Sequence, residues 1–265
     1  MNILDQIVAH KKQEVASRKS LVTIAELEAY PAFSRKTISL HQSLLDESKT
    51  GIIAEFKRKS PSKGIINSQA DVTKVTGAYA LYGASGLSVL TDATFFGGND
   101  TDLEAARRNN TPILRKDFMI DEYQFYEARA IGADVILLIA ACLTPAQVKA
   151  FAQLSKSLQL EVLLEIHNEE ELGHICAEVD FVGVNNRNLK TFTVDINTSL
   201  QLFPHIPADK PAIAESGISN VDTIVTLKQA GFKGFLIGEN FMKQPDPTIA
   251  FADFVTELKA KQNAH

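Results

Sequence analysis

Eight short apolar runs recur along the chain, and this repeat constrains the fold more than any other feature of the sequence. Most of the runs are rich in Val, Ile or Leu, as strands of a buried parallel sheet are. Each run ends in polar or small residues. The runs cover residues 51–56, 87–91, 113–116, 135–139, 162–166, 181–184, 212–215 and 234–237.

Segments with helical periodicity separate the runs. Several have a recognisable boundary, such as a Thr144-Pro145 start, a capping-box-like start over 168–171 and glycine stops at Gly132 and Gly231. Strands that alternate with helices predict a parallel sheet. The segments expected to be helical are 73–83, 121–131, one that begins at 144–145, one that begins at 168, 219–230 and 246–261.

Eight strand–helix units in 265 residues predict an α/β fold of the closed (β/α)8 TIM-barrel type, which takes about 250 residues. A doubly wound open sheet is the alternative. That fold seldom has eight consecutive units and needs a G-x-G-x-x-G turn after its first strand. Here the first run is followed by Lys-Arg-Lys-Ser-Pro-Ser-Lys-Gly over 57–64, so the barrel is favoured.

Residues 1–48 precede the first run and are too few for a core of their own. We therefore expect one domain over 1–265, with an N-terminal helical extension over 1–48 and the barrel over 49–265. The extension begins with a predicted surface helix that buries one stripe. The apolar residues at helical spacing there are Ile3, Leu4, Ile7 and Val8.

Composition excludes several classes of protein. The net charge of −5 argues against a nucleic-acid partner, and the longest apolar run, 135–143, is far too short to span a membrane. The N-terminal apolar residues precede the basic ones, the reverse of a secretory signal, and two cysteines do not make a disulfide framework. We therefore expect a cytoplasmic protein.

Five of the predicted strands end in ionisable or amide side chains. Residues two apart in a strand share a face, and the active site of a TIM barrel lies at the C-terminal strand ends. Acids and cations gathered in a partly desolvated cup shift one another's pKa values, which suits general acid–base chemistry. The residues expected there are Glu55, Lys57, Lys116, Phe118, Glu165, Asn185, Arg187 and Glu215.

The last two predicted strands are each followed by a glycine and then by a helical segment. Ser216-Gly217 and Gly238-Glu239 occupy these turns. Loops at these two positions are the usual phosphate site of TIM barrels, because backbone N–H groups can approach the anion closely. The sequence therefore predicts a phosphorylated small-molecule substrate.

The stretch Glu-Phe-Lys-Arg-Lys-Ser-Pro-Ser-Lys-Gly over 55–64 resembles the signature of the indole-3-glycerol phosphate synthase family. The resemblance covers nearly the whole chain and implies a carboxy-lyase of tryptophan biosynthesis that needs no cofactor. The family converts 1-(2-carboxyphenylamino)-1-deoxyribulose 5-phosphate into indole-3-glycerol phosphate, with release of carbon dioxide and water. Other segments that resemble the family are 3–4, 7, 11, 14–15, 90–92, 95–96, 114–118, 165–167, 184–189, 214–218 and 236–239.

The resemblance also implies roles for individual residues. Lys116 matches the general acid, Glu165 the general base, and Lys57 a lysine that holds the substrate carboxylate and can also donate a proton. The matches that orient these groups and the ribulose hydroxyls are Glu55, Asn185 and Glu215. The matches for polar lining are Ser60 and Arg187, and those for the apolar walls of the anthranilate pocket are Phe95, Phe118 and Leu189.

Some alternatives stay open. Lys116 could form a Schiff base, as in barrel aldolases, and the chain could be another phosphosugar enzyme or a non-catalytic phosphosugar-binding barrel. His167, His174 and Cys176 could suggest a metal site, but three or four converging ligands are needed, so no metal is expected. Because the chain ends at His265, soon after the last predicted helix, we expect a monofunctional enzyme; weak association with other tryptophan-pathway enzymes stays open.

The sequence departs from the common pattern of the family at a few positions. None of them is a catalytic match, so they bear on the surroundings of the pocket rather than on activity. The departures are Arg115, Asn186, Asn188 and Phe241.

Overall fold

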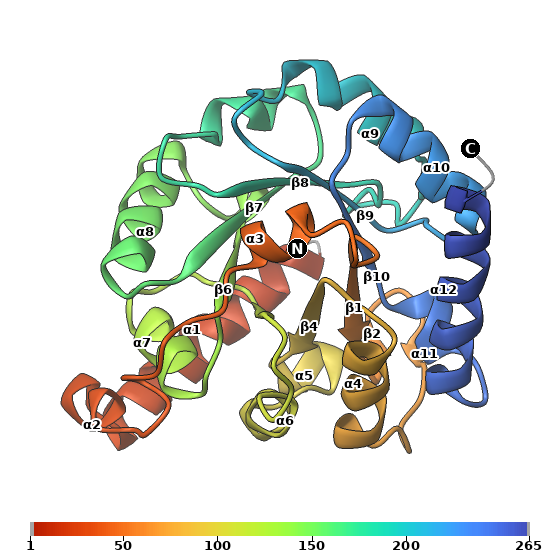
Figure 1. The fold of residues 1–265 in the computed structure, drawn as a ribbon. Helices are drawn as coiled ribbons and strands as arrows, with labels where there is room; N and C mark the ends of the chain where they lie inside the picture. The colour runs from red at the N-terminus through yellow and green to blue at the C-terminus, as the bar shows by residue number, and fades with distance from the viewer. Residues whose placement is uncertain (1–2, 264–265) are drawn as a thin grey trace.

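The computed structural model describes residues 3–263 and shows a closed barrel of eight parallel strands surrounded by helices (Figure 1). The predicted TIM barrel is confirmed, and each predicted strand matches an observed one to within a residue at either end. Neighbouring strands pair in the order β1-β10-β9-β8-β7-β6-β5-β4. The barrel strands are β1 (Ile52–Phe56), β4 (Gly86–Leu90), β5 (Ile113–Lys116), β6 (Val135–Ile139), β7 (Glu161–Ile166), β8 (Phe181–Asn185), β9 (Ala212–Glu215) and β10 (Gly234–Ile237).

Helices follow the strands on the outside of the barrel. The last of them, α12 (Pro247–Asn263), packs beside α4 (Val72–Leu81), where the Lys74 ammonium lies 3.0 Å from the Asp246 carboxylate. Between β1 and α4 a small antiparallel pair, β2 (Lys59–Ser60) and β3 (Gly64–Ile65), projects from the barrel. The remaining outer elements are α5 (Ala93–Phe96), α6 (Asp100–Ala106), α7 (Tyr123–Ala130), η1 (Ala140–Cys142), α8 (Pro145–Ser157), η2 (Glu169–His174), α9 (Asn197–Leu202), η3 (Phe203–His205), α10 (Val221–Ala230) and α11 (Glu239–Met242).

The alternation along the strands divides the apolar residues between two cores. In β1, Ile52, Ala54 and Phe56 pack outward against the helices, whereas Ile53 packs inside the barrel. Seven of the eight barrel strands contribute to both cores in this way, while β4 contributes Leu87 and Val89 to the outer core alone. Inward residues therefore continue toward the C-terminal end of a strand on the same face. This confirms the strand phase predicted from the sequence.

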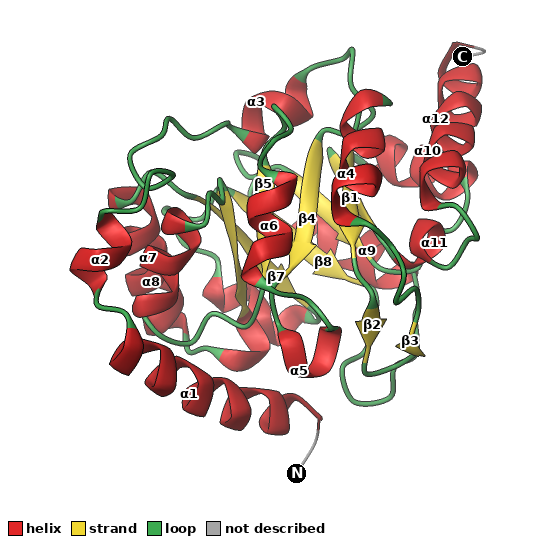
Figure 2. Cartoon of the chain, turned by 90° about the horizontal axis from the view of Figure 1, so that it is seen from below, coloured by secondary structure: helices red, strands yellow, loops and turns green. Residues whose placement is uncertain are grey.

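The N-terminal extension reaches both ends of the barrel (Figure 2). The short helix α3 (Leu40–Leu45) lies at the N-terminal ends of the strands, where Leu40 and Leu44 join the interior core. The long helix α1 (Ile3–Leu21) crosses the opposite end, and α2 (Ile24–Glu28) lies between them in the chain. The extension therefore closes one end of the barrel and roofs part of the other.

The segment that begins at residue 168 differs from the expected helix. Asn168 caps it as predicted, because its Oδ1 accepts a hydrogen bond from the Glu171 N–H at 3.2 Å. However, the segment is a 3₁₀ helix, η2, that ends at His174, so Cys176 lies outside it. No helix within residues 3–263 combines the length and apolar character that crossing a membrane requires.

Candidate active site

A cavity of about 460 Å³ opens at the C-terminal ends of the barrel strands. All but one of the predicted site residues line it, and they come from six strand ends: those of β1, β5, β7, β8, β9 and β10, with the segments that follow. The predicted residues that line the cavity are Glu55, Lys57, Ser60, Lys116, Phe118, Glu165, Asn185, Arg187, Leu189, Glu215, Ser216, Gly217, Gly238 and Glu239.

Lys116 lies at the centre of the charged groups. It is the last residue of β5, and its Nζ donates hydrogen bonds of 2.8 Å to both Glu165 on β7 and Glu215 on β9. The two glutamate side chains are at most 4 % exposed, whereas Lys116 is 15 % exposed and faces the cavity. A single ammonium group is therefore shared by two buried carboxylates and remains accessible to a ligand.

These three groups shift one another's pKa values in a definite pattern. Burial alone would lower the pKa of Lys116, but the surrounding carboxylates outweigh it and raise that pKa. Burial would raise the pKa of Glu165, but the charges of Lys116 and of the neighbouring His167 hold it well below the ordinary value. Burial raises the pKa of Glu215, and the nearby charge of Glu165 adds to this. Lys116 is therefore a charged acid, and Glu165 a charged base, at neutral pH.

A second ion pair lies at the C-terminal end of β1. The Lys57 Nζ is 2.5 Å from Glu55 Oε1, and both face the cavity two residues apart, as the strand phase predicts. The two ion-pair groups therefore place two lysines and three glutamates at the strand ends around one cavity.

Two glycines make room for the carboxylates. A Cβ at Gly183 would lie 2.3 Å from Glu215 Oε1, and a Cβ at Gly238 would lie 2.6 Å from Glu55 Oε1. Any larger residue at either position would displace the carboxylate or the strand.

We expect Gly183→Ala to lower kcat by about 10²-fold, because displacing a group of the site by about an ångström has an effect of that size. The new methyl group would push Glu215 away from Lys116. Steady-state turnover measures the resulting loss of kcat. Gly77→Ala is the matched control, since a Cβ there meets only Asn109 Oδ1 at 3.9 Å. Wild-type kcat in Gly183→Ala would show that the observed position of Glu215 is not needed.

The two glycine loops form another part of the lining. Ser216 and Gly217 both have positive φ angles, of 66° and 78°, so the chain turns sharply after β9. Across the cavity mouth, Glu239 lies 3.3 Å from Arg187 and 3.4 Å from Lys63. Backbone N–H groups and two cations are thus available to an anion at this side of the cavity.

The structure places one predicted site residue outside the cavity lining. Phe96 lines the cavity, with its ring 5.9 Å from that of Phe118, whereas Phe95 turns away and packs edge-on against His10 at 5.7 Å. Both belong to α5, in which successive side chains point in different directions, so only one of the pair can face the cavity. Asp92 fixes the choice because its carboxylate caps α5 by accepting a hydrogen bond from the Phe95 N–H at 2.7 Å.

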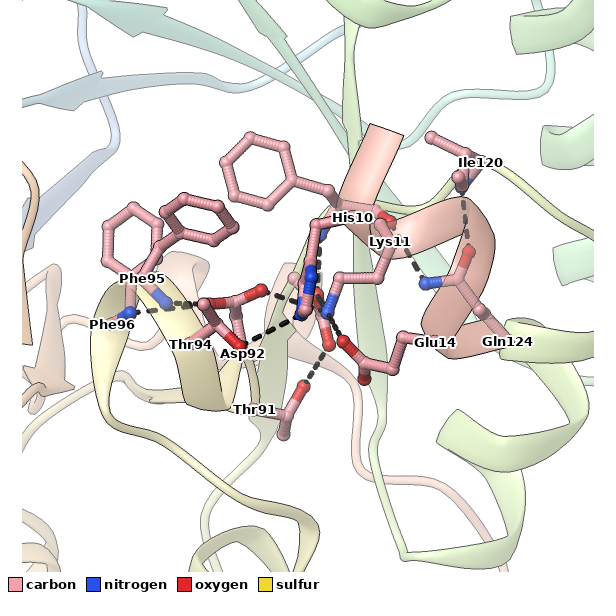
Figure 3. A network of polar contacts seen from close by, with 12 residues as sticks. His10, Lys11, Glu14, Thr91, Asp92, Thr94, Phe95, Phe96, Ile120 and Gln124 are labelled. Atoms are coloured by element: carbon pink, nitrogen blue, oxygen red, sulfur yellow. Dashed lines mark hydrogen bonds and ion pairs between the residues drawn. The ribbon is translucent and has the colours of Figure 1, made fainter. Parts of the chain in front are cut away.

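The roof supplied by α1 is a contribution that the sequence did not reveal. Ile3, Leu4 and Ile7 line the cavity from this helix. One turn further along, Lys11 is 1 % exposed and lies 3.0 Å from Asp92 and 2.9 Å from Asp117. Figure 3 shows the Lys11 side chain reaching down from α1 to the acidic groups below it.

Comparison with known proteins identifies the family. The model of the family described as indole-3-glycerol phosphate synthase matches residues 4–254. The chain belongs to the indole-3-glycerol phosphate synthase family. The enzyme of that name from Bacteroides thetaiotaomicron is 44 % identical over 259 residues, covering 97 % of this chain and 99 % of that protein. The one from Polaromonas sp. is 43 % identical over 256 residues, covering 95 % and 97 %.

Solved structures support the fold of this family member independently. The alpha subunit of tryptophan synthase from Legionella pneumophila superposes with a TM-score of 0.61 at 12 % identity, covering 85 % of this chain and 98 % of that one. A 3-hexulose-6-phosphate synthase superposes with a TM-score of 0.60 at 16 % identity, covering 79 % and 98 %. At such low identity these similarities show only that the barrel fold is shared.

Arg115 and Phe241, two of the residues that depart from the family pattern, have structural roles. Arg115 is 1 % exposed and faces Glu127 and Asp117 outside the barrel. Phe241 packs among other aromatic rings of the outer core, including that of Tyr79. Within the described part of the chain, no three His, Cys, Asp or Glu side chains are grouped so as to hold a metal ion.

Proposed function

We propose that this chain catalyses the indole-3-glycerol phosphate synthase reaction on 1-(2-carboxyphenylamino)-1-deoxyribulose 5-phosphate. The observation that carries the proposal is the Lys116 ammonium shared by Glu165 and Glu215 at the floor of a cavity that also offers cations and backbone N–H groups to two anions. The substrate carries a carboxylate and a phosphate, and its conversion needs an acid and a base together.

Ring closure uses the acid. The aromatic carbon that bears the carboxylate attacks the ketone carbon, and the carbonyl electron pair moves to oxygen, which takes a proton from Lys116. An alkoxide is a stronger base than an amine, so this transfer is downhill even though the pKa of Lys116 is raised by its carboxylate partners. Positive charge develops on the substrate nitrogen as an iminium.

The iminium then accepts the electrons of decarboxylation. The carbon–carboxylate bond breaks, its electron pair moves toward nitrogen, carbon dioxide leaves and the ring becomes aromatic again. After ring closure Lys116 regains a proton from solvent, since its side chain is 15 % exposed to the cavity. In the last step the hydroxyl leaves as water with this proton from Lys116, and Glu165 takes a proton from the neighbouring CH₂ group. Because Glu165 Oε2 is 2.8 Å from Lys116 Nζ, the proton it takes can return to the acid directly.

The other lining residues bind and orient the substrate in this proposal. Lys57, held by Glu55, faces the carboxylate until it leaves, and Arg187 and the Gly217 and Gly238 loops face the phosphate. The remaining assignments are Asn185 and Glu215 for orienting the acid and the hydroxyls, Ser60, Ser216 and Glu239 for polar lining, and Phe118 and Leu189, with Phe96 in place of Phe95, for the apolar walls.

The direct test is to add the carboxyphenylamino-deoxyribulose phosphate to purified protein and to follow indole fluorescence or absorbance. We expect turnover without added metal or cofactor, with one carbon dioxide released for each indole product. No turnover at high enzyme concentration would overturn the proposed function.

The aldolase alternative makes a different prediction. A Schiff base requires an uncharged amine, whereas the carboxylates around Lys116 raise its pKa and keep it charged. We therefore expect borohydride with substrate to trap no adduct at Lys116. An adduct found there by mass spectrometry would favour the aldolase chemistry instead.

The proposed setting is the cytoplasm, where the free thiols of Cys142 and Cys176 stay reduced. We also propose that the extension and the barrel form one domain, since α1 and α3 supply residues to the cavity and to the barrel interior. Weak association with other enzymes of tryptophan biosynthesis would be tested by co-sedimentation of the purified proteins.

A further inference from the structure

Behind the proposed base Glu165 lies a histidine that does not line the active-site cavity. His167 follows β7 and lies two residues after Glu165, so both side chains turn to the same side. Its Nε2 is 3.2 Å from Glu165 Oε1, and its side chain is only 9 % exposed. It lines a separate polar cavity of about 540 Å³ instead.

His167 is itself held from the far side. Glu171 Oε2 lies 3.1 Å from His167 Nδ1 and accepts the His167 backbone N–H at 2.7 Å. Its other oxygen accepts a hydrogen bond from the Asn168 amide at 3.2 Å. The imidazole therefore spans two carboxylates, with one ring nitrogen directed to each, and Glu171 fixes both its backbone and its ring.

The two oxygens of Glu165 consequently have different cationic partners. Oε2 accepts from Lys116 at 2.8 Å, and Oε1 faces His167. A hydrogen bond at one oxygen and a cation 3.2 Å from the other disfavour rotation of the carboxylate, so its free lone pairs keep one preferred direction relative to the cavity. Orientation of this kind is what a base needs if it is to remove a proton from carbon.

We propose that His167, anchored by Glu171, is a positioning residue that fixes the orientation and the charge of Glu165. The inference rests on the proposed function, because it assigns a partner to the base of that reaction. His167 touches no part of the active-site cavity, so its effect on turnover is exerted through Glu165.

Charged and titratable groups surround the pair formed by Glu165 and His167. Lys116 and Glu215 face Glu165 across the barrel, and Glu55 acts on Lys116 from β1. On the side of η1, burial raises the pKa of Cys142 to about 12, with Glu165 and Glu171 adding to the effect, so this thiol stays uncharged. Burial would lower the pKa of His167, but its two glutamates outweigh this and raise it to about 10.

The first test measures kcat and KM as a function of pH in His167→Gln, which keeps a hydrogen-bond donor but removes the charge. We expect kcat to fall about 10- to 100-fold, as for other residues that orient a catalytic group, with KM within about 2-fold. The acid limb of kcat should move to higher pH by about 1 unit or more, because Glu165 loses a neighbouring cation.

His174→Gln is the matched control. His174 is the last residue of η2, the 3₁₀ helix that carries Glu171, and its ring nitrogens lie 3.1 and 2.9 Å from the backbone carbonyl oxygens of Glu171 and Leu143. We expect this variant to keep the acid limb of the wild type. If His167→Gln also kept both kcat and the acid limb, the positioning role would be overturned.

The second test does not depend on turnover. The NMR signals of the His167 ring are identified by their loss in His167→Gln. They should remain those of an imidazolium as the pH rises, until the pH approaches about 10. In Glu171→Gln the ring loses one anionic partner, so its titration should move to lower pH. A wild-type His167 that titrates near the ordinary value of 6.5 would overturn the inference.

The two proposals fail in distinguishable ways. If the wild-type protein shows no turnover, the proposed function is wrong, whereas the NMR titration still reports whether Glu165 and Glu171 hold a charged His167. If the wild type turns over and the His167 variants behave like it, the function stands and only the positioning role is wrong.

Discussion

Replacing Lys116 by methionine is expected to lower kcat by about 10²- to 10⁴-fold, the usual contribution of a general acid. Methionine keeps the apolar stem of the side chain but removes the ammonium group that gives hydrogen bonds of 2.8 Å to both Glu165 and Glu215. Substrate affinity should change much less, because Lys57, Arg187 and the glycine loops still face its anions. The measurements are turnover and calorimetric substrate binding.

The same replacement affects stability, which has to be separated from catalysis. Two carboxylates that are at most 4 % exposed would lose their shared cation, and breaking a buried ion pair costs about 3–5 kcal/mol. The double variant Lys116→Met with Glu215→Gln removes the surplus negative charge. We expect it to recover most of the thermal stability but none of the turnover.

Lys74→Met provides a matched surface control, since Lys74 is 66 % exposed in its ion pair with Asp246. It should keep wild-type turnover and lose at most about 1 kcal/mol of stability. Near-normal turnover in Lys116→Met would show that another group protonates the ketone oxygen, and Lys57 would then be the residue to test.

Sequence periodicity was enough to predict the barrel and the residues at its strand ends. In β1, the period of two places Glu55 and Lys57 on the same face as Ile53, and the structure shows that face turned inward. Burial on both faces restricts a strand to apolar residues until its end, so a charged residue there marks the rim of the barrel. Regular elements carry this information because their geometry is fixed.

The loops and the extension were less predictable. Whether Phe95 or Phe96 faces the cavity depends on the Asp92 cap, which no periodic pattern encodes. The Glu171 side chain was expected to complete a capping box at Asn168, but it reaches one residue further back, to His167. In each case one hydrogen bond between nearby residues decides the direction of a functional side chain.

Lys11 shows why a spacing argument can miss a buried charge. It lies between Ile7 and Val15 at intervals of four residues, so all three fall on one stripe of α1, and all three are buried. Only the apolar members of that stripe predict its burial from the sequence. Two of its acidic partners, Asp92 and Asp117, come from distant parts of the chain, and the nearby Glu14 does not by itself indicate that a cation would be buried there.

Replacing Lys11 by methionine is expected to destabilise the protein by about 3–5 kcal/mol, because it leaves buried carboxylates without their cation. Asp92 and Asp117 are each 1 % exposed and lie within 3.0 Å of the Lys11 Nζ, and Glu14 lies 2.9 Å from it. Burial would lower the pKa of Lys11, but these carboxylates outweigh it, so the group is charged in the folded protein. Thermal and urea unfolding measure the loss.

Lys12→Met is the control for this prediction, because it makes the same chemical change one residue further along α1 at an exposed position. It should change stability by at most about 0.5 kcal/mol. Turnover of the folded Lys11→Met protein should also fall, since Asp92 caps the helix that carries Phe96 and Asp117 lies between Lys116 and Phe118. Stability equal to that of Lys12→Met would mean that α1 is held by its apolar contacts alone, and that the buried charges serve neither the roof nor the cavity below it.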